Sequence, residues 1–501
     1  MKKIKSFFLF LCASFLLASC SSEVPNDFTE IQRTPHIYPD YLGVTIPINI
    51  APLTFRILEG GEDYVTRYTY KGGELVVSGK DCIPSIDDWR AMLQAAKGSA
   101  LQIDVFVKTA KGWVKYKRFE QMVAPEPVDE YLSYRLIAPS YVSYEHLTIN
   151  QRNLTNFDET EIYNNMLLST EENGQCINCH SYQNYSTKNM QFHARQTFGG
   201  TLIVVDGKPV KYDLKTDSTI SGGVYPAWHP TQKLIAYSVN STGQAFHTRS
   251  QEKIEVQDRA SDLIVFDIER DMIISVSTDP NQYETFPSWS SDGNTLYFCS
   301  AFLNMSDTIG THQGDRMQMD AYKKFKYDLW RIPYNQKTKT FGQKEKVIDA
   351  AAIGKSITLP RVSPDGKYLL FTMGDYGCFH IWHKSSDLYL LDLATGKFRK
   401  LENVNSPDVE SYHTWSSNGR WIVFSSRRED GSYTRSYFAY FDKQNKAHKP
   451  FVLPQAYPEH NHERYTSYNI PEFMKEPVAL SPQQFAAALH AEPIKAKYQS
   501  R

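Results

Sequence analysis

The stretch that decides the fold is Pro287-Ser288-Trp289-Ser290-Ser291-Asp292-Gly293-Asn294-Thr295-Leu296-Tyr297-Phe298. It places an Asp-Gly turn between two strand-like segments, which is the pattern of a tight β-hairpin. Three other stretches repeat this pattern, beginning at Pro226, Pro360 and His413. The four copies begin 61, 73 and 53 residues apart, whereas one propeller blade takes about 40–50 residues. The repeat therefore predicts β-propeller blades that carry loop insertions.

Three of the four copies are followed by a further strand pattern, at residues 262–267, 328–332 and 387–392. A partial copy precedes them at residues 201–205. Four clear blades are few for a closed ring, so we expect strands from elsewhere in the chain to complete it. Over residues 199–455 the repeat resembles that of TolB-like propellers, which implies a WD40-type ring that serves as a docking platform. A plain β-sandwich is the alternative, and it leaves four matching units unexplained.

A second motif, Cys176-Ile177-Asn178-Cys179-His180, precedes the repeat. The C-x-x-C-H run is typical of covalent haem c attachment, with Cys176 and Cys179 bound to the porphyrin and His180 as the proximal iron ligand. A zinc ribbon would need a second C-x-x-C pair, and a thioredoxin-like pair would need a βαβ context. A small disulfide or a chance match is the remaining alternative.

Haem iron often takes a sixth ligand. His193 is the first candidate because it lies close downstream, with His247 and Met190 as alternatives. Arg195 is a candidate partner for a haem propionate, since guanidinium binds carboxylate through two parallel hydrogen bonds.

The N-terminus has the pattern of an export signal. Lys2, Lys3 and Lys5 precede an apolar run at residues 7–17 that is too short for an ordinary membrane span. Residues 17–20 resemble a bacterial lipobox, which implies cleavage after residue 19 and lipid on Cys20. Ser21 resembles the outer-membrane sorting pattern, so we expect a lipid-anchored protein of the outer membrane that faces the periplasm. A simple secretory signal is the alternative.

The charge balance, the missing sequence motifs and the number of cysteines each argue against a class of protein. The chain has 55 basic and 56 acidic residues; without the three lysines of residues 1–19 there are 52 and 56, a net charge of −4. This balance gives no indication of nucleic-acid binding. No G-x-S-x-G elbow, Walker loop or dinucleotide fingerprint occurs. Cys82, Cys299 and Cys378 remain after haem and lipid are assigned, and this odd number argues against a disulfide framework.

The predicted fold is mainly β, with a small sandwich-like domain and a loop or helical haem-binding segment before the propeller. Within the haem-binding segment, residues 159–168 fit a helix. His460 and His462 fit either a metal site or a polar loop, of which we favour the loop. The predicted boundaries are a signal peptide at 1–19, a tether at 20–42, the β-rich domain at 43–139, the haem-binding segment at 140–198, the propeller at 199–455 and a tail packed on the propeller at 456–501.

Together these features resemble a group of exported monohaem propeller lipoproteins. The resemblance implies a c-type cytochrome that exchanges single electrons with a protein partner in the cell envelope. One alternative is a TolB-like binding or scaffold protein with a structural or sensory haem. A second is a haem redox enzyme subunit, distantly similar to the alpha subunit of hydrazine synthase. In that family a tyrosine shortly after the motif can bind iron, and the spacing of Tyr182 and Tyr185 does not match it.

Overall fold

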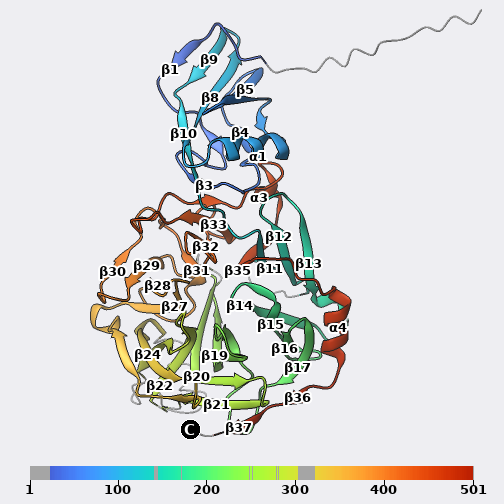
Figure 1. The fold of residues 1–501 in the computed structure, drawn as a ribbon, viewed down its shortest axis with the longest axis vertical. Coiled ribbons are helices and arrows are strands. Elements are labelled where there is room, and N and C mark those ends of the chain that lie inside the picture. Colours follow the sequence, from blue (N-terminus) through green and yellow to red (C-terminus); the bar gives the residue numbers. More distant parts are fainter. Residues whose placement is uncertain are drawn as a thin grey trace, which may run out of the picture.

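The computed structural model describes residues 23–139, 145–170, 172–247, 249–250, 252–277, 279, 281–302 and 322–499. A small N-terminal β domain stands on a larger body of radially arranged sheets (Figure 1). The predicted mainly β architecture is confirmed, while Cys20 lies outside the described residues.

The N-terminal domain begins inside the stretch predicted as a tether. Two sheets, one of seven strands and one of three, enclose a single helix over the described residues. The helix begins where the Ser85 hydroxyl accepts a hydrogen bond from the Asp88 amide at 3.1 Å, and it buries Trp89 against the sheets. The elements are β1 (Thr29–Ile31), β2 (Ile37–Tyr38), β3 (Thr45–Pro47), β4 (Phe55–Ile57), β5 (Asp63–Tyr70), β6 (Gly73–Ser78), β7 (Asp81–Cys82), α1 (Ile86–Ala95), β8 (Ala100–Thr109), β9 (Gly112–Tyr116) and β10 (Phe119–Ala124).

The large body is a β-propeller with six blades over the described residues. Blade 1 consists, from its innermost strand outwards, of β35 (Ser467–Met474), β11 (Tyr131–Ile137), β12 (Thr148–Asn153) and β13 (Glu159–Asn164). Blade 2 consists, in the same order, of β14 (Gln175–Gln183), β15 (Ser186–Gln196), β16 (Gly200–Val205), β17 (Lys208–Asp213) and β36 (Ile494–Lys495). Blade 3 consists of β18 (Val224–Trp228), β19 (Leu234–Phe246), β20 (Ile254–Asp267), β21 (Met272–Ser277) and β37 (Lys497–Gln499).

Blades 4 to 6 contain the three later copies of the repeat. Blade 4 consists of β22 (Gln282–Trp289), β23 (Thr295–Phe302), β24 (Tyr327–Asn335), β25 (Thr340–Phe341) and β26 (Glu345–Ile348). Blade 5 consists of β27 (Ser356–Val362), β28 (Tyr368–Gly374), β29 (Asp387–Asp392) and β30 (Phe398–Lys400). Blade 6 consists of β31 (Glu410–Trp415), β32 (Trp421–Ser426), β33 (Arg435–Tyr440) and β34 (Phe451–Val452). Cys299 is fully buried on β23.

The C-terminal tail closes the ring. Strand β35 pairs antiparallel with β11, so that Phe473 lies opposite Leu132 in blade 1. Every residue of β35 is buried. The helix α4 (Pro482–His490) packs beside β13 and β17 (Figure 1). Strands β36 and β37 then extend the outer edges of blades 2 and 3. The prediction that strands from elsewhere complete the ring is confirmed, and the tail is part of the propeller itself.

The prediction of a loop or helical segment at residues 140–198 is wrong. Its described residues form strands β12 to β15, and the helix predicted at 159–168 is strand β13 followed by one 3-10 turn at Asn165–Leu167. The missed hairpin between β14 and β15 turns through Asn184 and Tyr185, with φ of 48° and 67°. Two consecutive residues at positive φ make the tight turn that twisted strands favour, without the Asp-Gly signal of the other blades.

Candidate functional site: the propeller axis

The C-x-x-C-H run lies on β14, the innermost strand of blade 2. In a regular strand, residues three apart point to opposite faces. Here a bulge between Asn178 and Ser181 shifts the register, and Cys179 has a φ of 58°. The extra residue in the bulge changes the face of the strand to which the following side chains point. As a result, Cys176 and Cys179 both border cavities on the propeller axis.

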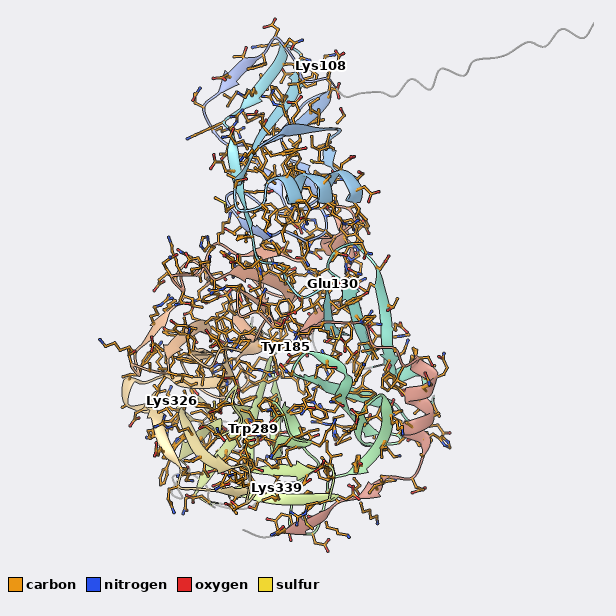
Figure 2. The ribbon with its side chains drawn as sticks, in the orientation of Figure 1. Lys108, Glu130, Tyr185, Trp289, Lys326 and Lys339 are labelled. Carbon is orange, nitrogen blue, oxygen red and sulfur yellow. The ribbon has the colours of Figure 1, made fainter. Side chains whose placement is uncertain are left out.

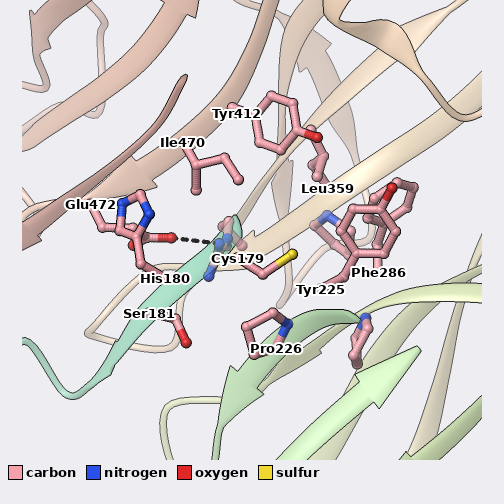
Figure 3. A pocket seen from close by; sticks show the side chains of 13 residues that line it. Cys179, His180, Ser181, Tyr225, Pro226, Phe286, Leu359, Tyr412, Ile470 and Glu472 are labelled. Carbon is pink, nitrogen blue, oxygen red and sulfur yellow. Dashed lines mark hydrogen bonds and ion pairs between the residues drawn. The ribbon is translucent and has the colours of Figure 1, made fainter. Parts of the chain in front are cut away.

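All six innermost strands contain this bulge, each with one non-glycine residue at φ between 44° and 58°. The six residues meet around a narrow axial cavity of about 40 Å³ (Figure 3). They are Cys179, Tyr225, Phe286, Leu359, Tyr412 and Ile470. Four of the six precede a proline, at 226, 287, 360 and 471, whereas Cys179 and Tyr412 precede His180 and His413. His180 and His413 therefore occupy equivalent positions in two blades.

A wider cavity of about 570 Å³ adjoins the narrow one, since Tyr225 and Tyr412 line both. None of the described residues that line it is Asp or Glu, and two are arginines. A volume of this size is typical of a cofactor or small-molecule site. Its polar and sulfur-bearing lining includes Arg135, Cys176, Asn178, His193, Arg195, Asn240 and Asn469.

A third cavity, of about 340 Å³, opens from the other side of the constriction. It shares Ser181, Arg361 and Glu472 with the narrow cavity and reaches Tyr185 and Trp289 (Figure 2). At its floor Arg361 and Glu472 form an ion pair at 2.7 Å, while burial raises the pKa of Glu472. The narrow axial cavity therefore connects the wide cavity, which two arginines line, with a third cavity, in which the charge of Arg361 is paired with that of Glu472.

His180 differs from His413 in its hydrogen bonding. The Nε2 of His413 lies 3.1 Å from the Leu370 carbonyl oxygen, and its Nδ1 lies 3.5 Å from the Thr372 hydroxyl. His180 is equally buried, yet neither of its ring nitrogens makes a hydrogen bond of good distance and angle, and among the described residues only the backbone of Ile470 and of Ser133 lies near enough to oppose the fall in its pKa. Burial lowers the pKa of His180 to about 3, so the ring is neutral at physiological pH. A buried imidazole without a hydrogen bond is unusual and calls for an explanation.

Two of the predicted site residues, His193 and Arg195, join Cys176 at the wide cavity. His193 lines it, with Nδ1 3.2 Å from the Thr201 hydroxyl, and burial lowers the pKa of His193 to about 3. Arg195 lines the same cavity from the end of β15. Both follow Cys176 across the β14–β15 hairpin, where Cys176 pairs with Arg195 and Asn178 pairs with His193.

Met190 and His247, the alternative ligands, do not reach the axis. Met190 is fully buried in the apolar core of blade 2, which excludes it as a ligand in this structure. His247 lies beyond the end of β19 beside Tyr322, with ring centroids 6.3 Å apart, and it lines none of the three axial cavities.

The structure forms no multi-residue metal site at His460 and His462. They lie on the short helix α3 (His460–Glu463), not in the predicted loop, and His462 Nδ1 lies 2.7 Å from Glu459. Over the described ranges, no group of three His, Cys, Asp or Glu side chains could hold a metal ion. No described helix is long and apolar enough to cross a membrane.

Sequence reasoning missed Tyr225 and Tyr412, which border both the narrow and the wide cavity. Each comes one residue before the start of a repeat copy, at Pro226 and His413. The repeat could have marked this position, because it is the bulge residue of every innermost strand.

The residues on the axis include the donors that a covalently bound haem takes, shared between the wide cavity and the narrow one. Both motif cysteines are free thiols, Cys176 borders a cavity of sufficient volume, and Cys179 and His180 border the adjoining narrow one. The ring nitrogens of His180 supply the imidazole donor that haem iron takes.

The fold and this site define a six-bladed β-propeller with a C-x-x-C-H strand on its axis. No protein-family model matches the sequence, and no curated protein matches it. Among solved structures, the tricorn protease is 14% identical with a TM-score of 0.34, and the match covers 79% of this chain and 36% of that chain. A puromycin-hydrolyzing peptidase of Mycobacterium tuberculosis is 11% identical with a TM-score of 0.36, over 71% of this chain and 52% of that chain.

Prolyl oligopeptidase B from Galerina marginata is 12% identical with a TM-score of 0.33, over 79% of this chain and 54% of that chain. This chain spans between about a third and about half of the length of the solved structures it matches. These likenesses concern the fold and carry no argument about activity.

Proposed function

We propose that this chain is a c-type cytochrome of the cell envelope that passes single electrons to or from a docked protein partner. The observation that carries the proposal is His180, an imidazole buried on the axis beside two free thiols, whose ring nitrogens make no hydrogen bond of good distance and angle. The alternative role, a structural histidine between blades, is the one that His413 fills with both ring nitrogens near partners.

In this proposal Cys176 and Cys179 hold the porphyrin through thioethers, and His180 supplies the fifth iron ligand. His193, which lines the wide cavity, supplies the sixth. Arg195 pairs with a propionate, in a cavity whose described lining has no carboxylate to compete for it. When bound, haem c supplies reversible one-electron chemistry.

The N-terminal lipid anchor would place the haem site in the cell envelope, and the propeller would provide the surface for its partner. Cys20 would carry lipid and tether the protein at the outer membrane, facing the periplasm. The TolB-like propeller would then present a rigid surface to the redox partner. A rigid scaffold suits docking because little conformational entropy is lost on binding.

A ligand substitution tests this arrangement in protein matured with the haem-attachment machinery. We expect a six-coordinate, low-spin spectrum that carbon monoxide does not change, because His180 and His193 would both bind the iron. His193→Ala should convert it to a high-spin spectrum that responds to carbon monoxide. His247→Ala is the matched control and should change nothing, since His247 lines no axial cavity. An unchanged spectrum in the His193 variant would rule out His193 as the sixth ligand.

A further inference from the structure

Asp258 is a buried carboxyl directly behind the wall of the wide cavity. It lies on β20 with 4% of its surface exposed. One carboxyl oxygen accepts a hydrogen bond from the Asn240 side-chain amide at 2.6 Å, and the other accepts one from the Tyr327 hydroxyl at 2.8 Å. Asn240 itself lines the wide cavity. Asp258 is therefore one side chain removed from the space proposed for the haem.

The surroundings of Asp258 are polar but hold no cation bound to it. Over the described part of the chain, no basic side chain forms an ion pair with this carboxyl. Burial raises the pKa of Asp258 to about 6, and the hydrogen bonds from Asn240 and Tyr327 act against the rise. The titratable groups that face it are Tyr225 from β18, Tyr327 from β24 and Cys378 from the segment after β28.

Two further titratable groups lie close by. Glu255, three residues earlier on β20, is held by His383 at 2.6 Å, and Tyr283 on β22 lies near Tyr327. Both side chains of the Glu255–His383 contact are buried. Among the described residues, Asp258 is thus a carboxyl beside the cavity that has hydrogen-bond donors for its ionised form and no ion-pair partner.

We propose that Asp258 couples electron transfer at the axial cavity to the release and uptake of one proton. This inference rests on the proposed function. When one electron leaves the cavity for a one-electron acceptor, Asp258 releases its proton to solvent, and the new carboxylate offsets the positive charge gained in the cavity. When one electron returns from a donor, the carboxylate takes a proton back. Charges interact strongly at this depth because little water screens them.

The coupling would make the reduction potential depend on pH. Between the pKa values of Asp258 in the two redox states, the midpoint potential should fall as pH rises. The limit for one proton and one electron is about 59 mV per pH unit, a tenfold change in the one-electron equilibrium.

Asp262 offers a matched control on the same strand. Burial and the neighbouring Glu284 raise the pKa of Asp262 to about 6 as well. Asp262 lines none of the three axial cavities, and it has no hydrogen bond to Asn240. If Asp258 causes the pH dependence of the midpoint potential, that dependence should persist in Asp262→Asn and be lost in Asp258→Asn.

The test is a redox titration of the matured, haem-loaded protein from pH 5 to pH 8, combined with infrared difference spectra of the two redox states. We expect a sloping potential in the wild type and in Asp262→Asn, and a flat one in Asp258→Asn. The infrared spectrum should show a protonated carboxyl band that is lost on oxidation and is absent from Asp258→Asn. If that variant does not fold, Tyr327→Phe should move the sloping region to higher pH, because the ionised carboxylate loses one donor.

Two results would overturn the inference alone in a protein that carries haem. One is a flat potential in the wild type, and the other is a slope that persists in Asp258→Asn. A matured protein without haem would overturn the proposed function together with this inference, so the two failures are distinguishable.

Discussion

A chain that ends at Thr466 is expected not to fold. This truncation removes β35, the innermost strand of blade 1, and leaves the exposed edge of β11 without a partner. Burial of an Ile, Phe or Met side chain contributes about 1.5–3 kcal/mol. Ile470, Phe473 and Met474 together therefore account for about 5–9 kcal/mol, as much as the net stability of many domains. We expect insoluble or protease-sensitive protein with no cooperative thermal transition.

A shorter truncation provides the control. A chain that ends at Glu492 loses β36 and β37, which only extend the outer edges of blades 2 and 3. Ile494 on β36 is 42% exposed, so little apolar burial is lost. This variant should remain soluble and melt cooperatively within a few degrees of the full chain. Cooperative melting of the chain that ends at Thr466 would show that β35 does not close the ring.

Replacement of His180 should change the haem spectrum, whereas replacement of His413 should change only stability. The two histidines occupy equivalent positions in blades 2 and 6. His180→Ala removes the proposed iron ligand, so we expect a high-spin or otherwise altered spectrum while both thioethers keep the haem attached. His413→Ala leaves the Leu370 carbonyl without its partner. Such an orphaned buried group costs about 1–3 kcal/mol.

The two variants are compared by visible spectra and by denaturant unfolding of the matured protein. The account requires a spectral change in His180→Ala with no spectral change in His413→Ala. Identical spectra for His180→Ala and the wild type would mean that His180 is a second structural histidine, and the iron ligand would then have to be sought elsewhere on the axis.

Much of the fold could be predicted from the sequence because the Asp-Gly or Asn-Gly turn and its flanking strands are local signals. They identified the blades that begin at Pro226, Pro287, Pro360 and His413. Blade 2 was predicted only from its partial copy at residues 201–205, which is β16, because its hairpin turns through Asn184 and Tyr185 without the Asp-Gly signal. Blade 1 was missed because β35 and β11 are about 330 residues apart in the chain.

The site could be predicted only in part. The motif spacing identified Cys176, Cys179 and His180, and proximity in sequence identified His193 and Arg195, which the β14–β15 hairpin brings to the wide cavity. Met190 lies in the same hairpin, but strand alternation directs it into the core. Asp258 could not be found, since its relation to the axis depends on how separate blades meet, whereas the repeat could have marked the position of Tyr412.

The most direct test of this account is the mass of the matured protein after denaturation, compared with that of Cys176→Ala/Cys179→Ala. We predict that the wild type keeps exactly one covalently added haem and that the double variant keeps none while retaining its fold. A wild-type mass without added haem would contradict the assignment of this propeller as a cytochrome.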